Sequence, residues 1–180
     1  MSAGNKISQV IPPLNEDDRI QGSLDATLIL MEYGDYQCPQ SGQAHALIKV
    51  IQQQLGEQFC FVFRHFPQSK RSLRAAESAE AAAVQDRFWQ MHDLLFEHQQ
   101  HLEDHNLVEY AHNLGLEMSR FLWEMSTHVH LAKIQNDLDS GKANGAEEAP
   151  TFFIGVKHQG TKDLKTLMLA ILKINRNSRL

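Results

Sequence analysis

The sequence Cys38-Pro39-Gln40-Ser41 stands at the junction between a strand pattern and a helical pattern. The apolar run 27–33 precedes it, and segment 44–55, whose apolar residues recur at helical spacing, follows it. Pro39 fits the first turn of a helix, where no backbone N–H is needed. A cysteine at the start of a helix lies beside unpaired N–H groups and the positive end of the helix dipole, which favour a thiolate. We therefore expect Cys38 to be a reactive nucleophile.

Further strand patterns frame a long helical stretch. The aromatic and β-branched run 58–66 ends at Pro67 and predicts a second core strand, paired in parallel with the first through a right-handed crossover. Only helical patterns occur from about residue 72 to 139. A strand over 151–154, another beginning at Val156, and an amphipathic helix over 164–174 follow. The order predicts an α/β protein whose core is interrupted by helices.

Turn and capping residues divide the helical stretch. An alanine-rich helix extends from about residue 75 toward 89, with a break predicted at Asp86. Asp104 and Ser119 are predicted N-caps of two further helices, the first ending at Gly115 and the second continuing to about Leu138. We divide the chain into an N-terminal arm (1–18), a core in two pieces (19–70 and 140–180) and a helical insertion (71–139).

The bulk composition is that of an ordinary globular protein. The chain has 180 residues, of which 42% are hydrophobic and 22% charged. Its net charge of −5 disfavours nucleic acid and anionic membrane surfaces as partners. No run approaches the ~20 apolar residues of a membrane span, and no signal-peptide pattern is seen. Two cysteines make no disulfide scaffold, so we expect a cytoplasmic protein without membrane insertion.

Three other positions deserve a chemical interpretation. Glu32 interrupts an apolar strand, where it is either a buried carboxyl that relays a proton near Cys38 or an exposed residue at the strand edge. Pro150 precedes an apolar strand and suits a cis peptide bond, which would leave the backbone of Ala149 free to pair with an extended peptide; an ordinary trans proline is the alternative. Cys60 lies among phenylalanines and is expected to be a small buried hydrophobe.

The ten histidines do not predict a metal site. Among the close pairs only His101 and His105 have the i,i+4 spacing of helical ligands, and the residues between them resemble an inter-helix loop. No cysteine pair of the kind common in structural zinc sites accompanies them. We expect a solvated, histidine-rich helical surface and no bound metal.

Four motifs in order carry a resemblance to a known family. They are EYGDYQCPQS at 32–41, FVFRHFP at 61–67, FWQMHDLLF at 88–96 and PTFFI at 150–154. Together they resemble the DsbA family of thioredoxin-fold proteins over residues 19–176, in the branch of DsbA-like domains found alone or fused to sodium/proton antiporters. The resemblance implies a thioredoxin fold, with a central mixed sheet flanked by helices and an inserted all-helical subdomain.

The resemblance also implies roles for individual residues. Cys38 matches the nucleophilic first cysteine, Glu32 the buried acid beneath the site, and Pro150 the cis proline that faces the cysteine. Pro39, Gln40 and Ala149 then join Pro150 as substrate-binding positions. Two positions depart from the family pattern, since Ser41 replaces the resolving cysteine and Ala149 replaces the usual threonine or valine.

The serine at position 41 leaves three readings of the function open. A dithiol enzyme resolves its mixed disulfide with its second cysteine, a step that Ser41 cannot perform, although its hydroxyl is able to hydrogen-bond the Cys38 thiolate. The first reading is a monothiol oxidoreductase acting on protein or peptide thiols and disulfides, with glutathione or another external thiol as co-substrate and no cofactor. The second is a non-catalytic domain that binds peptides or proteins. The third is an engineered replacement of the second cysteine.

Overall fold

A four-stranded mixed sheet forms the centre of the molecule, for which the computed structural model describes residues 11–156. The predicted helix 164–174 and the start of the arm lie outside the described residues. The strands are β1 (Arg19–Gln21), β2 (Leu28–Gly34), β3 (Phe59–His65) and β4 (Thr151–Val156), in the order β1-β3-β2-β4. Val156, which was predicted to begin another strand, ends β4 instead.

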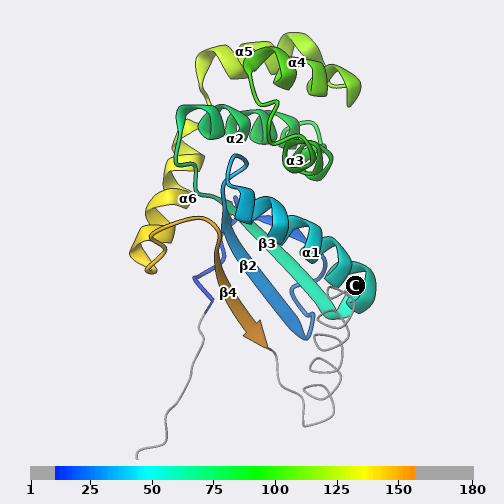
Figure 1. Ribbon diagram of the computed structural model, residues 1–180, viewed down its shortest axis with the longest axis vertical. Helices are drawn as coiled ribbons and strands as arrows, with labels where there is room; N and C mark the ends of the chain where they lie inside the picture. The colour runs from blue at the N-terminus through cyan, green and yellow to red at the C-terminus, as the bar shows by residue number, and fades with distance from the viewer. Residues whose placement is uncertain (1–10, 157–180) are drawn as a thin grey trace, which may run out of the picture.

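The unit that positions Cys38 is β2, the helix α1 (Pro39–Leu55) and β3. After α1 and a short 3-10 turn, the chain returns as β3, which pairs in parallel with β2 from Leu28↔Phe59 to Gly34↔His65. β1 and β4 are antiparallel to their neighbours. The predicted strand–helix–parallel strand unit is therefore confirmed, and α1 packs along one face of the sheet (Figure 1).

Five helices separate β3 from β4. They are α2 (Lys70–Ala83), α3 (Phe88–Glu97), α4 (Asp104–Asn113), α5 (Met118–Thr127) and α6 (Leu131–Ala143). In Figure 1, α2 to α5 gather beyond the end of the sheet at which β2 and β3 finish, and α6 leads back to the sheet and to β4. Cys38, which follows β2, consequently lies where the core meets the helical layer.

The helix boundaries show where local sequence signals succeed and fail. The break at Asp86 is confirmed, because this residue has a positive φ of 58° between α2 and α3. The single helix predicted from Ser119 to Leu138 is wrong, because His128 adopts the left-handed conformation and ends α5 before α6 begins. α6 also continues to Ala143, beyond the predicted end.

The two predicted N-caps are each displaced by a residue or two. Glu103, rather than Asp104, is the N-cap of α4. Glu117, rather than Ser119, caps α5, and its carboxylate accepts the backbone N–H groups of Ser119 and Arg120 at 2.9 and 2.8 Å. A glutamate is an uncommon N-cap, so the preference for Ser, Thr, Asp and Asn pointed to the wrong neighbour.

The sheet separates two apolar clusters. Phe59, Phe61 and Phe63 belong to the larger cluster, with α1 and the helical layer. Cys60 and Val62 alternate with them and belong to the second cluster, in which Cys60 has no exposed surface. The expectation that Cys60 is a buried hydrophobe is confirmed.

A buried ion pair fastens the segment before β1 to the sheet. The Arg64 side chain is 1% exposed and that of Asp18 is not exposed, and two bonds of 2.6 and 2.8 Å join them. Arg64 also donates to the hydroxyl of Tyr33 at 2.8 Å and to the carbonyl of Pro13 at 2.7 Å. Such a pair holds its surroundings in place mainly because either charge alone would be costly to bury.

Within residues 11–156, no helix combines the length and the apolar character that crossing a membrane requires.

Candidate active site

The sulfur of Cys38 lies at the start of α1, where Cys38 is the N-cap residue and Pro39 begins the helix. Its Sγ hydrogen-bonds the Oε1 atom of Gln40 at 3.1 Å and the carbonyl oxygen of Ala149 at 3.2 Å. The peptide bond between Ala149 and Pro150 is cis. The fold thus brings the cysteine and the proline loop together across 111 positions of sequence, and the partly exposed sulfur is open to a reactant.

The contacts of the sulfur suit a thiol at rest. Both partners are oxygen acceptors, so they accept the S–H proton, whereas the helix N-terminus favours the thiolate. The side-chain amide of Gln40 can rotate by half a turn, which exchanges its oxygen and nitrogen with little change in shape. Gln40 is therefore able to accept from the thiol and to donate to the thiolate.

Ser41 takes part in the framework of the loop before α1. Its side chain is fully buried, and its Oγ accepts the backbone N–H of Asp35 at 3.3 Å. The carboxylate of Asp35 in turn accepts the N–H groups of Gln37 and Gln68, at 2.7 and 2.9 Å. The possible hydrogen bond from Ser41 to the Cys38 sulfur is absent from the described residues, and Asp35 is the partner instead.

Glu32 is buried within the sheet and is not an exposed residue at the strand edge. It is 1% exposed, and its Oε1 has no hydrogen-bond partner among the described residues. Burial raises the pKa of Glu32 to about 8. The absence of a side chain at Gly34 makes room for the carboxyl group, since a Cβ there would stand 2.8 Å from Oε1. Glu32 is therefore a buried acid able to hold or release a proton near neutral pH.

The raised pKa predicts that Glu32 destabilises the fold as pH rises. The proton is held more tightly in the folded chain than in the unfolded one, so the stability is complete below pH 4.5 and is lost as pH rises toward 8. For Glu32→Gln, which cannot ionise, the free energy of unfolding relative to wild type should increase by about 4 kcal/mol between pH 5 and pH 8.5. Guanidinium titrations of both proteins at the two pH values measure it, and a pH-independent difference would contradict the assignment.

Gln99 and His92 fix the active-site loop to the helical layer, and neither was predicted as a site residue. The Nε2 of Gln99 donates to the backbone carbonyls of Tyr36 and Cys38, at 2.9 and 2.8 Å. The hydroxyl of Tyr36 is hydrogen-bonded to Nδ1 of His92 on α3 at 2.9 Å. His92 belongs to one of the motifs behind the family resemblance, but no local pattern indicated Gln99.

The expected solvated histidine surface is wrong for three of the histidines. His45, His65 and His92 are at most 7% exposed. Burial lowers the pKa of each, and Nε2 of His65 donates to the carboxylate of Glu80 at 2.7 Å. Packing against aromatic rings, which no spacing rule captures, accounts for their burial.

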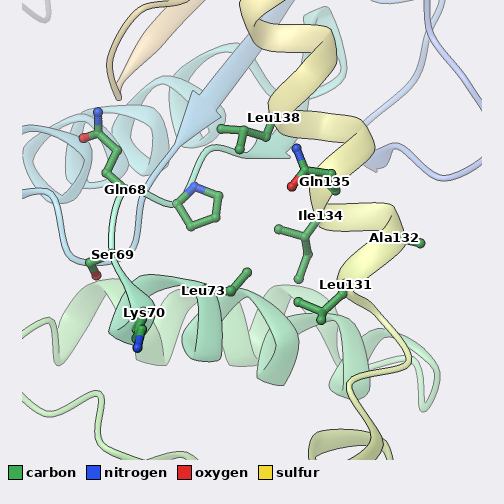
Figure 2. Close-up of a pocket in the computed structure, with 10 residues that line it drawn as sticks. Gln68, Ser69, Lys70, Leu73, Leu131, Ala132, Ile134, Gln135 and Leu138 are labelled. Atoms are coloured by element: carbon green, nitrogen blue, oxygen red, sulfur yellow. The ribbon is translucent and has the colours of Figure 1, made fainter.

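A largely apolar pocket opens beside the active-site loop. Its volume is about 580 Å³, and it lies between the β3–α2 connection, α2 and α6. Figure 2 shows Leu73 of α2 facing Leu131 and Ile134 of α6. Two residues of its rim, Gln68 and Ser69, hydrogen-bond the loop that carries Cys38, the second through Gln37 at 2.6 Å. The pocket is thus joined to the site by hydrogen bonds.

A cysteine at the first turn of the helix after a central parallel strand, against a cis proline, is the arrangement of a thioredoxin-type site. The chain belongs to the thioredoxin family, whose model, described as thioredoxin, matches residues 14–173.

The chain matches part of the length of two longer curated relatives. The chain is 35% identical over 171 residues to Na⁺/H⁺ antiporter NhaA 1 of Mycobacterium sp. (strain KMS), covering 92% of this chain and 28% of the relative. It is 34% identical over 170 residues to Na⁺/H⁺ antiporter NhaA of Herminiimonas arsenicoxydans, covering 93% and 27%. The chain therefore spans little more than a quarter of the length of these relatives, which is consistent with the antiporter-associated branch.

Solved structures share the fold. BdbD from Bacillus subtilis in its oxidised form has a TM-score of 0.75 at 21% identity, covering 91% of this chain and 95% of that one. α-DsbA1 of Wolbachia pipientis has a TM-score of 0.71 at 24% identity, covering 90% and 92%. The fold is that of DsbA-like thiol–disulfide oxidoreductases, helical insertion included, as the motifs predicted.

Proposed function

We propose that the protein is a DsbA-like thiol–disulfide oxidoreductase in which Cys38 is the single reacting thiol. The observation that carries the proposal is the position of its Sγ, partly exposed at a helix start and 3.2 Å from the carbonyl of Ala149 beside the cis proline. Position 41 holds a serine, and Cys60 is buried within the sheet. An external thiol must then complete the cycle.

The cycle uses two exchange steps. In the first, the Cys38 thiolate attacks one sulfur of a disulfide R–S–S–R′, forming Cys38–S–S–R and releasing R′ as a thiolate. In the second, the thiolate of an external thiol such as glutathione attacks the R sulfur, forming a new disulfide and releasing Cys38 as a thiolate. The R sulfur stays in a disulfide throughout, so the sulfur of R′ is reduced to a thiolate while the sulfur of the external thiol is oxidised into the new disulfide. The two changes balance, so that no cofactor is needed, and when R is itself glutathione the product is glutathione disulfide.

The surroundings of Cys38 support a role for each predicted site residue. Pro39 starts the helix whose N-terminus faces the thiolate, and Gln40 lies within hydrogen-bonding distance of the sulfur. Ala149 and Pro150 hold the backbone that an extended peptide would pair with. Glu32, buried with a pKa of about 8, would exchange protons with the reacting thiols. The adjoining apolar pocket offers a place for apolar side chains of a protein substrate.

The test measures glutathione-dependent reduction of a glutathionylated peptide. The reaction is monitored through the coupled oxidation of NADPH. We expect turnover in the wild type and in the control Cys60→Ala, and loss of at least roughly 100-fold in Cys38→Ala, because no other described thiol is exposed. Circular dichroism of each variant checks folding. Activity retained by Cys38→Ala would contradict the proposal.

A peptide-binding domain without turnover is the second candidate, and the burial of Ser41 favours it. The buried serine hydroxyl accepts the backbone N–H of Asp35 and takes no part in a redox step. This candidate predicts that binding of an immobilised partner peptide survives Cys38→Ala and that the turnover assay shows no activity in the wild type. The two functions are therefore distinguished by the same pair of proteins.

A further inference from the structure

Three potential metal ligands meet at the interface between α1 and α3. His45 comes from α1, and His92 and Asp93 come from α3. One ligand atom from each residue lies within 4.8 Å of those of the other two. The close histidine pairs of the sequence did not include this set, because its members are 47 and 48 positions apart and only the packing of the two helices unites them.

The spacing of the cluster suits a tetrahedral ion. Nε2 of His45 lies 3.4 Å from Oδ1 of Asp93. Two ligands at 2.0–2.1 Å from a tetrahedral zinc ion stand about 3.3–3.4 Å apart, so this pair already has the separation of two ligands on one ion. Two imidazoles and a carboxylate form a donor set that binds first-row transition ions, with one position left for water.

Neighbouring groups already orient the two imidazoles. The hydroxyl of Tyr36 occupies Nδ1 of His92, leaving Nε2 as the nitrogen available to an ion. The ring of His45 stacks on that of Phe96, with centroids 4.9 Å apart and an interplanar angle of 21°.

The carboxylate of Asp93 is more exposed than the ring of His45, and it forms an ion pair with Lys49. The side chain of Asp93 is 29% exposed, whereas that of His45 is 9% exposed. Nζ of Lys49 lies 2.5 Å from Oδ2 of Asp93, on the other oxygen from the one that faces His45. A bound cation would repel this ammonium group, so Lys49 and an ion compete for the same carboxylate.

We propose that His45, His92 and Asp93 form a binding site for a divalent transition-metal ion, with zinc as the preferred occupant. The ion joins α1, the helix that begins beside Cys38, to α3 of the helical layer. It is separate from the thiol chemistry, because none of its ligands contacts the Cys38 sulfur. Its role is structural, adding a cross-link between the core and the helical layer.

The test is zinc binding by the full chain after Cys38 has been blocked with iodoacetamide, measured by equilibrium dialysis at pH 7.5. We expect one zinc ion per chain in the wild type. Affinity should fall by roughly 10-fold or more in His45→Gln and in Asp93→Asn, since each removes a ligand. Lys49→Met should instead raise it, because the competing ammonium group is removed.

A second measurement identifies the ligands directly. Cobalt added to the blocked protein should give the intense visible absorption of a four-coordinate ion, lost in His45→Gln and retained in the matched control His101→Gln. Thermal unfolding without metal checks that each variant is folded. Absence of stoichiometric zinc from the wild type, or equal affinity in His45→Gln and His101→Gln, would overturn the proposal.

Discussion

Replacing Ser41 by cysteine is expected to give the protein a self-contained dithiol cycle. The new thiol would stand three residues after Cys38 in the first turn of α1, where the serine is now. An intramolecular thiol held near the mixed disulfide acts at an effective concentration far above that of a millimolar external thiol, so resolution should be roughly 100-fold faster or more. The reduction of an insulin disulfide by dithiothreitol measures the gain.

The controls for this prediction separate redox chemistry from packing. Ser41→Ala removes the same hydroxyl, which accepts the N–H of Asp35, but adds no thiol. It should leave the disulfide-reduction rate near the wild-type level. The double variant Ser41→Cys/Cys38→Ala should lose the gain, because Cys38 must attack first. If Ser41→Cys folds and is no faster than Ser41→Ala, position 41 does not control resolution.

Removing the charge of Arg64 is expected to destabilise the fold severely. Arg64→Met would leave the carboxylate of Asp18, which has no exposed side-chain surface, without its cationic partner. Breaking one half of such a buried pair costs about 3–5 kcal/mol. The free energy of unfolding from guanidinium titration at pH 7 measures the loss.

A surface pair and a double variant provide the comparison. Arg71 pairs with Glu103 at 3.0 Å, but both side chains are more than 40% exposed, so Arg71→Met should cost about 1 kcal/mol or less. Arg64→Met combined with Asp18→Asn should recover part of the lost stability, because no unpaired carboxylate remains. Equal effects of Arg64→Met and Arg71→Met would contradict the account of the buried pair.

Short-range patterns were sufficient to predict the core of the fold. The alternation of apolar and turn residues around Cys38 indicated β2, α1 and β3 in order, and proline and glycine signals marked their ends. The same patterns located a helical stretch but misplaced its internal ends. His128 carries no strong breaking signal, yet it adopts the left-handed conformation that separates α5 from α6. That conformation depends on tertiary contacts, among them the 2.7 Å bond from His128 to Glu77.

The residues of the site also fall into those that local sequence patterns predicted and those that they did not. Cys38 and Pro39 were identified from a local pattern, whereas Glu32 and Pro150 needed family motifs to choose between two readings. Gln99 and the His45–His92–Asp93 cluster could not be predicted, because each depends on helices that approach only in the folded chain. A single sequence contains little information about such distances.

The central claim is that Cys38 alone forms the mixed disulfide and depends on an external thiol to release it. Intact-mass spectrometry after mixing the wild type with a glutathionylated peptide tests this most directly. We predict a single adduct, located on Cys38 by proteolysis, that persists after excess peptide is removed and disappears when reduced glutathione is added. An adduct on Cys60, or one that resolves without added thiol, would contradict the claim.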